Sequence, residues 1–257
     1  MRIPGLPLLD TPLDIAWRDG QLALAAGPSP EAVAAASIAA LPDAFAALLG
    51  AHRGRRVHLR VGDEHVRLFH HERPRGARSP AELEAALRLR MQSLHGDAGD
   101  DWTLRWTAAP WARADTVCAM PGALLAAVRA GCRAARVTCT RLRADWVACA
   151  AGAPRRGRLW VLNAGAGTLT LGLLADGRVL GVRRLPPPGR HDDLAEVMAR
   201  AQPLFGATPD DALAPIWLHG GALPVPRGAA AARVRREGDG DAVAAARWQP
   251  LGSRGPR

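Results

Sequence analysis

The chain has 257 residues with a hydrophobic content of 48%, which is enough for one large domain or two modest ones with a packed core. Its formal net charge is +10, but all 34 basic residues are arginine, tyrosine is absent, and the arginines are spread singly or in pairs. This pattern indicates a compositional bias, so no specific nucleic-acid partner is expected. The lack of lysine also excludes P-loop, Schiff-base and kinase-type lysine chemistry.

The four cysteines are Cys118, Cys132, Cys139 and Cys149, and no two of them form a CxxC pair. We interpret them as reduced packing residues and not as disulfides or zinc ligands, so no metal site is expected. No apolar run reaches the roughly 20 residues of a membrane-spanning helix, and the chain does not open with a signal-peptide pattern. A cytoplasmic protein is therefore expected.

The first hundred residues predict two hairpins and two helices. Alternating strand residues flank an Asp-Gly turn in residues 13–25 and a Gly-Asp turn in residues 57–69, which is typical of hairpins. Asp43 is expected to cap a helix that ends at Gly50. Ser79 is followed by proline and then glutamate at capping-box spacing, which marks a second helix start.

The next segment alternates strands and helices. Residues 101–106 form a strand pattern, a helix is expected from Pro121, and a strand follows at 137–140. A short helix is then expected at 144–151, before the proline- and glycine-containing link at 153–157. The order favours an α/β fold.

The central stretch, residues 158–186, predicts an antiparallel meander. A buried strand at 159–162 leads into a glycine-containing corner, and an Asp-Gly pair turns the chain again after residue 175. Glycines at such a corner let backbone amides line a small concavity for a phosphate, and Thr168 adds a hydroxyl. The residues of this stretch alone favour a plain meander.

The last part of the chain predicts one more helix and one more strand. Asp192 or Asp193 is expected to cap a helix that carries an apolar face to residue 201. Residues 215–221 form a buried strand that opens into a double glycine. From residue 227 onward the chain lacks periodicity, so residues 227–257 are expected to be a disordered tail.

The order of these motifs resembles the actin-like ATPase superfamily, and most of all the branch that contains the type IV pilus protein PilM and the cytoplasmic domain of the type II secretion protein GspL. Its second phosphate loop, Asp-x-Gly-x-x-x-Thr, corresponds to the stretch from Asn163 to Thr168. Its first loop matches Asp14 and Ile15, but Trp17 and Arg18 stand where glycine and serine are usual, so Trp17 is expected to crowd a phosphate.

The resemblance implies an α/β, actin-like (RNase H-like) fold with two lobes of mixed sheets flanked by helices. It implies a first lobe at residues 1–156 with an inserted subdomain at about 57–106, and a reduced second lobe at 157–226. It also implies a site for ATP and Mg²⁺, in which the cofactor-binding residues are Asp14, Asn163, Gly165, Gly167, Thr168, Gly220 and Gly221.

The function implied is a non-catalytic cytoplasmic scaffold, since the second loop has the amide of Asn163 in place of a carboxylate. Such a scaffold would recruit the cytoplasmic tail of an inner-membrane pilus or secretion protein, and it would reach the membrane only through that partner. Residual ATP binding stays open. The alternatives are an active ATPase or kinase of the same superfamily, or a nucleic-acid-binding protein with its arginines on one face.

Overall fold

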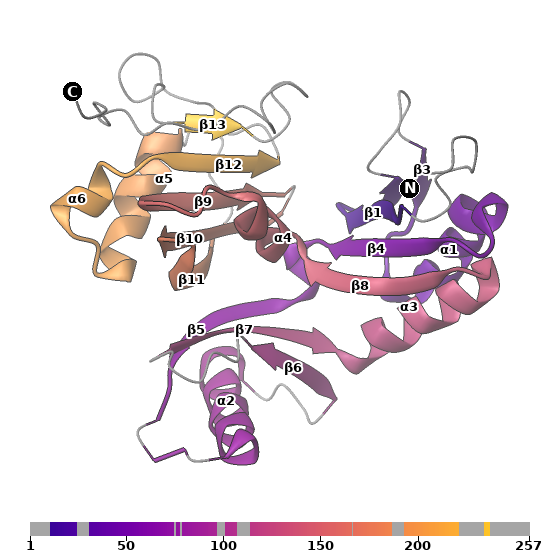
Figure 1. Cartoon of the computed structure of the whole chain (residues 1–257), viewed down its shortest axis with the longest axis horizontal. Coiled ribbons are helices and arrows are strands. Elements are labelled where there is room, and N and C mark those ends of the chain that lie inside the picture. The colour runs from indigo at the N-terminus through magenta and orange to yellow at the C-terminus, as the bar shows by residue number, and fades with distance from the viewer. Residues whose placement is uncertain are drawn as a thin grey trace, which may run out of the picture.

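The computed structural model describes residues 11–24, 31–74, 76–77, 79–96, 101–106, 114–165, 167–186, 193–220 and 234–236. Its strands form two five-stranded sheets and one three-stranded sheet. Figure 1 shows the two larger sheets as separate lobes, with the three-stranded sheet and its helix as a third body. The architecture is α/β, with mixed sheets flanked by helices, as the sequence predicts.

The first lobe is built on a sheet of order β3-β2-β1-β4-β8. Strands β1, β4 and β8 run parallel to one another, β2 pairs antiparallel with β1, and β3 pairs antiparallel with β2. Its strands are β1 (Leu13–Arg18), β2 (Gln21–Leu24), β3 (Ala32–Ala34), β4 (Arg56–Val61) and β8 (Thr138–Ala144). Its longer helices are α1 (Leu41–Leu49) and α3 (Gly122–Ala135), and the short 3₁₀ turns are Ile38–Ala40, Gly50–His52 and Asp63–His65.

Helices α1 and α3 pack closely against each other. A Cβ at Gly131 of α3 would lie 2.7 Å from Cγ of Phe45, so only glycine lets the two helices approach this far. The predicted cap at Asp43 is wrong. The N-cap of α1 is Ala40, and proline occupies the first turn, where its missing N–H costs nothing. Asp43 lies in that first turn, where its charge favours the helix dipole.

The second lobe repeats the sheet of the first. Its order is β11-β10-β9-β12-β13. Strands β9, β12 and β13 run parallel to one another, β10 pairs antiparallel with β9, and β11 pairs antiparallel with β10. The strands are β9 (Arg158–Ala164), β10 (Leu169–Ala175), β11 (Arg178–Leu185), β12 (Ile216–Gly220) and β13 (Val234–Arg236). The helical segments are α5 (Leu194–Ala201), the 3₁₀ turn Gln202–Phe205 and α6 (Pro209–Ala212).

Strand β13 corrects one expectation, because Val234–Arg236 lie in the stretch expected to be disordered. These residues pair in parallel with β12 and complete the fifth position of the sheet. Their pairing is possible since a strand needs only a sheet edge with free backbone groups, which β12 would otherwise present. A tertiary partner of this kind leaves no local signal in the tail.

The two sheets place the predicted hairpins at matching positions. In strand order β1 corresponds to β9, β2 to β10 and β4 to β12. Consequently the Asp19-Gly20 turn of the first lobe corresponds to the corner at 165–168, and the similar Asp176-Gly177 turn belongs to the following hairpin. Both Asp-Gly turns have positive φ at each residue, as two-residue hairpins require.

The third body is a sheet of order β5-β7-β6 that carries α2. Its elements are β5 (Arg67–Glu72), α2 (Pro80–His95), β6 (Trp102–Trp106) and β7 (Ala114–Pro121). Ser79 and Glu82 form the predicted capping box. The predicted hairpin at 57–69 is wrong, because β4 lies between β1 and β8 in the first lobe and β5 pairs with β7. The subdomain strands therefore span 67–121 and do not begin at 57.

Helix α4 (Asp145–Gly152) lies where the two lobes meet (Figure 1). Its Trp146 is buried, and the indole N–H donates to the carbonyl of Val161 on β9 at 3.0 Å. Gly172 of β10 has no side chain at the place where the Trp146 ring passes. As a result, one hydrophobic core includes residues of both lobes. No helix in the described residues is both long and apolar enough to cross a membrane.

Candidate functional site

The carboxyl ends of the inner strands meet between the lobes, and the first contact there is a buried hydrogen-bond set that we name the Asp63 junction. It comprises Asp63, just after β4, Asn163 near the end of β9, and the backbone N–H of Trp146. The Asn163 amide donates to Oδ2 of Asp63 at 2.7 Å, and the Trp146 N–H donates to Oδ1 at 3.0 Å. Asp63 and Asn163 are both 4% exposed.

Burial dominates the titration of Asp63. It raises the pKa of this carboxyl from an ordinary 3.8 to about 6, and the nearby charge of Asp145 acts in the same direction. Hydrogen bonds from Trp146, Asn163 and Thr170 favour the ionised form but do not cancel the burial. Asp63 therefore takes up a proton under mildly acidic conditions.

A second contact between the lobes, which we name the Arg18 junction, consists of Arg18, Arg60, Asp145 and His219. Nη1 of Arg18, at the end of β1, lies 3.5 Å from Nε2 of His219 on β12. Oδ2 of Asp145 lies 3.7 Å from that Arg18 nitrogen and 3.7 Å from the same His219 nitrogen. Nε of Arg60 is 3.8 Å from the other Asp145 oxygen.

The net effect on Asp145 is opposite to that on Asp63. Burial alone would raise the pKa of the Asp145 carboxyl, but the His219 hydrogen bond and the charges of Arg60 and Arg18 outweigh it and lower the pKa. Asp145 thus stays ionised inside a cluster of cations. The neighbouring groups therefore shift the pKa values of these two carboxyls at the same interface in opposite directions.

The two junctions are related by the internal repeat. The Asp63 junction joins the end of β4 to the end of β9, and the Arg18 junction joins the end of β1 to the end of β12. Strand β1 corresponds to β9, and β4 corresponds to β12. Exchanging the two lobes therefore turns the β4–β9 contact into the β12–β1 contact. Contacts that swap in this way are the mark of a twofold relation between two units.

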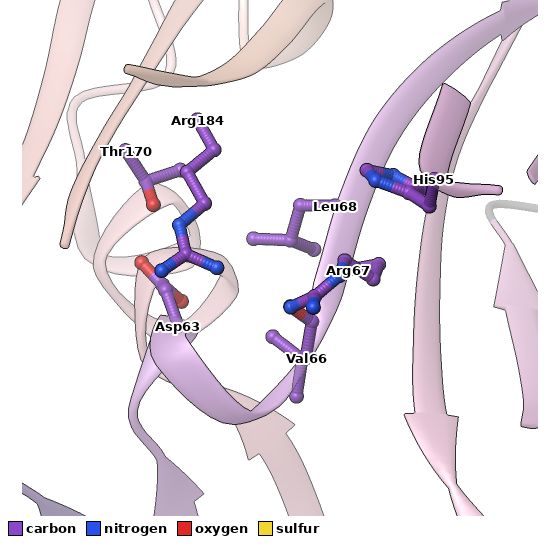
Figure 2. A pocket seen from close by; sticks show the side chains of 7 residues that line it. All are labelled: Asp63, Val66, Arg67, Leu68, His95, Thr170 and Arg184. Carbon is purple, nitrogen blue, oxygen red and sulfur yellow. The ribbon is translucent and has the colours of Figure 1, made fainter. Parts of the chain in front are cut away.

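A small hollow lies beside the Asp63 junction, between the subdomain and the second lobe. Figure 2 shows Arg184 and Thr170 on one side and Arg67 and His95 on the other, with Asp63 below. Its volume is about 20 Å³, which is room for about one water molecule and far less than a nucleotide. Burial and the neighbouring arginine charges lower the pKa values of Arg67 and His95.

Most of the residues predicted to bind a cofactor do lie at this interface. The Gly165 N–H donates to the Thr168 carbonyl at 2.8 Å and closes the corner. The Thr168 hydroxyl is buried and accepts from Arg184 at 3.3 Å. A Cβ at Gly165 would lie 3.6 Å from Oδ1 of Asp19, so the corner faces the first-lobe turn. Apart from its chain neighbours, no described atom comes within 4 Å of a Cβ position at Gly167.

The double glycine and Asp14 were also predicted to bind a cofactor, and Asp14 does not lie with Asn163 in the structure. Gly220 ends β12 and pairs with Ala164 of β9, whereas Gly221 lies outside the described residues. Asp14 is at the amino end of β1, exposed, with Oδ1 3.3 Å from Nδ1 of His58. The predicted placement of Asp14 with Asn163 is therefore corrected, since β1 carries Arg18 to the junction and leaves Asp14 about 13 Å away along the strand.

Trp17 also differs from its expected role. It is fully buried, its indole N–H donates to the Ala35 carbonyl at 2.8 Å, and its ring stacks on His65 at 3.7 Å between centroids. Successive strand residues point to opposite faces. Trp17 therefore belongs to the core, and its neighbour Arg18 is the residue that reaches the space between the lobes.

Four residues at the interface were not predicted from the sequence: Asp63, Arg60, Asp145 and His219. Asp63 sits in a Gly-Asp pair that is equally typical of a hairpin turn, and Asp145 in a helix start. One available signal was the spacing of Asp145 and Cys149, one helical turn apart, which places both side chains on one face. The pairing across the lobes has no local signal.

These features define an actin-like ATPase fold, and one solved structure with low sequence identity supports this assignment. A protein of unknown function with an actin-like ATPase fold from Bacteroides thetaiotaomicron superposes with a TM-score of 0.53 at 9% identity, over 82% of each chain. The cytoplasmic domain of EpsL, an inner-membrane component of the Vibrio cholerae type II secretion system, gives 0.49 at 13% identity over 80% of each chain.

The PilM–PilN type IV pilus biogenesis complex gives a TM-score of 0.49 at 19% identity, over 78% of this chain and 67% of that one. No protein-family profile and no curated protein matches this sequence. The likeness to the Bacteroides thetaiotaomicron structure supports the fold alone.

Proposed function

We propose that this protein is a non-catalytic scaffold of a type IV pilus or type II secretion platform, which recruits the cytoplasmic tail of an inner-membrane partner. The observation that carries the first half of the proposal is the bond from Asn163 to Asp63. Phosphoryl transfer to water needs groups that hold a metal and orient the nucleophile. Asn163 stands at the position of the second-loop carboxylate, and its amide instead donates the hydrogen bond that joins the two lobes.

Asparagine suits this contact better than the aspartate that its superfamily position usually carries. Two carboxylates at the 2.7 Å separation found here would repel each other unless they shared a proton. An amide removes the repulsion and supplies the donor that buried Asp63 needs. The residue that departs from the catalytic motif is therefore the one that fits the closed interface.

The second lobe contact supports the same proposal. Arg18 and His219 approach across the space where the resemblance places a nucleotide, between the first-lobe turn and the double glycine. The Asp19 N–H at that turn is already taken by Oε1 of Glu64 at 3.1 Å. Amides and side chains that would face phosphates are thus engaged with other parts of the chain.

The tail-binding half of the proposal rests on the sequence resemblance and on the edge of the subdomain sheet. In the order β5-β7-β6, β5 packs beside β11 of the second lobe, and β6 is the outer strand among those described. An extended tail adds to such an edge through main-chain hydrogen bonds. Half-buried Trp102 and Trp106 flank this edge and supply apolar contacts.

The test uses a synthetic peptide with the sequence of the cytoplasmic tail of an inner-membrane pilus or secretion protein from the same organism. Binding is measured by fluorescence anisotropy to the full chain and to a variant in which residues 67–120 are replaced by a short Gly-Ser linker. We expect binding by the full chain and its loss in the variant, with circular dichroism to verify folding. A matched control alters the first-lobe edge with Val33→Lys on β3 and should bind normally. Unchanged binding by the folded linker variant would move the interface elsewhere.

A further inference from the structure

A second feature lies within the Arg18 junction. Asp145 and Cys149 are one turn apart on α4, and His219 comes from β12 of the other lobe. One ligand atom from each of the three, a carboxylate oxygen, the Sγ and an imidazole nitrogen, lies within 4.8 Å of the other two. All three residues are buried, at 3%, 1% and 7% exposure.

We propose that Asp145, Cys149 and His219 form a site for a divalent transition metal of the zinc class, which ties α4 to β12. Carboxylate, thiolate and imidazole are the three ligand types that tetrahedral zinc takes in proteins, and water supplies a fourth position. Zinc–ligand bonds of about 2.0 to 2.3 Å at tetrahedral angles place ligand atoms about 3.3 to 3.7 Å apart. The Asp145 Oδ2 to His219 Nε2 distance is 3.7 Å, and all three ligand atoms lie within 4.8 Å of one another, so side-chain movements of about 1 Å bring them to bonding positions.

Arg18 is the group with which the metal would compete. Its Nη1 lies 3.7 Å from Oδ2 of Asp145 and 3.5 Å from Nε2 of His219, the two atoms that a metal would bind. The Arg18 side chain is 42% exposed, so it can turn into solvent without burying its charge. Metal and guanidinium are therefore alternative cations for the same pair of ligands.

Arg60 has a different position and stays compatible with the metal. Its Nε lies 3.8 Å from Oδ1 of Asp145, the oxygen that the metal leaves aside. A partner on the second oxygen fixes the direction of a ligating carboxylate, as outer groups do in metal sites. The geometry thus separates the two arginines into one competitor and one orienting group.

Charges and protons can be accounted for when the metal binds. On binding, the Cys149 thiol loses its proton to solvent, and the resulting thiolate with the Asp145 carboxylate neutralises the two charges of the ion. His219 binds as the neutral imidazole through Nε2, so the proton that this nitrogen shares with Asp145 in the metal-free protein moves to Nδ1 or leaves to solvent. Since at least one proton is released, the affinity should rise with pH. The bound metal would join the helix between the lobes directly to the second-lobe sheet.

The test is a Co²⁺ titration of the full chain carrying Cys118→Ser, Cys132→Ser and Cys139→Ser, so that Cys149 is the sole thiol. We expect one equivalent of Co²⁺ to produce a thiolate-to-cobalt charge-transfer absorption in the near ultraviolet. Adding Arg18→Gln should tighten the apparent Kd about tenfold, because a competing positive charge is removed beside the ion. Adding Cys149→Ser should abolish the absorption.

Absence of the absorption in both the Cys149-only protein and its Arg18→Gln form would overturn the proposal, as would its persistence in Cys149→Ser. X-ray absorption of the zinc-loaded wild-type chain gives an answer that does not depend on the variants folding. One sulfur with nitrogen and oxygen neighbours supports the site. Two sulfurs, or none, would place the metal elsewhere and contradict it.

Discussion

The two junctions occupy corresponding places in a duplicated fold, yet their physics differs. The Asp63 junction is buried and uses a 2.7 Å and a 3.0 Å hydrogen bond. The Arg18 junction has contacts of 3.5 to 3.8 Å, and its arginine is partly exposed. The repeated strand order therefore places the two contacts at corresponding positions, and the residues at each position decide how strong the contact is.

The difference assigns separate tasks to the two contacts. A buried carboxylate with two directed donors costs much to break, because each orphaned partner keeps its desolvation penalty. Long ion pairs with a partly solvated arginine cost little to rearrange. The first junction suits permanent closure, and the second can exchange one cation for another.

Removal of the Asp63 side chain should give the largest effect. In Asp63→Ala the buried Asn163 amide and the Trp146 N–H lose their acceptor, at about 1 to 3 kcal/mol each. We expect the free energy of unfolding to fall by roughly 4 kcal/mol in urea titrations at pH 7. Asp63→Asn keeps the shape and one of the two acceptor oxygens, so it should lose less stability than Asp63→Ala and serves as a partial control. A loss below about 1 kcal/mol in Asp63→Ala would show that this junction does not hold the lobes.

The pH dependence of stability gives the next effect. The pKa of Asp63 is raised from 3.8 to about 6 in the folded protein, so the folded state holds this proton more tightly than the unfolded chain does. Asp63 therefore favours folding below about pH 4, and that contribution is lost as the pH rises through about 6, on the order of 3 kcal/mol in total. The lowered pKa values of Asp145 and Glu64 act in the opposite sense.

The measurement must isolate Asp63 from these other groups. Unfolding free energies of the wild type and Asp63→Asn are compared between pH 4 and pH 7, and the difference between them is plotted. We expect the wild type to lose stability relative to Asp63→Asn as the pH rises. A flat difference would mean that the folded pKa of Asp63 is ordinary.

Introducing at position 163 the aspartate of the motif that this stretch resembles should lower the stability less. Asn163→Asp places a second carboxylate against Asp63, and we expect a loss of about 2 kcal/mol at pH 7. Part of this loss should return at pH 5, where one proton shared by the pair relieves the repulsion. Thermal unfolding at both pH values, with Asn163→Ala beside it, distinguishes repulsion from simple loss of the donor. Equal losses at both pH values would contradict like-charge repulsion.

Local chemistry made much of the fold predictable, and long-range contacts made the interface hard to predict. The Asp-Gly turns, the Ser79 capping box and the strand at 159–162 are all decided by neighbouring residues. Asp63 and Asn163 are 100 positions apart, and no spacing rule joins them. The resemblance assigned Asp14 to the cofactor site because Asp14 and Ile15 match the first-loop motif. In the structure Asp14 lies at the amino end of β1, and Arg18, beside the tight Asp19-Gly20 turn, lies at the interface instead.

The weaker junction should respond least in stability. Arg18→Ala removes contacts of 3.5 and 3.7 Å from a partly exposed side chain, and such pairs contribute about 0 to 1 kcal/mol. We expect a change below about 1 kcal/mol in urea titrations in metal-free buffer. The matched variant Arg60→Ala tests the other arginine of the cluster. A loss for Arg18→Ala as large as that for Asp63→Ala would make the two junctions equivalent after all.

The smallest expected effect is on ATP turnover, which should be indistinguishable from background in the wild type. Phosphate release with Mg²⁺ and ATP requires carboxylates that hold the metal and a group that orients water. Asn163 is neutral and bonded to Asp63, while Asp14 lies at the far end of β1. We therefore expect Asp14→Ala to match the wild type in a steady-state phosphate-release assay. Asn163→Asp should also fail to produce turnover, since Arg18 and His219 still approach each other between the lobes. Turnover above background that disappears in Asp14→Ala would instead establish an active ATPase and end the scaffold proposal.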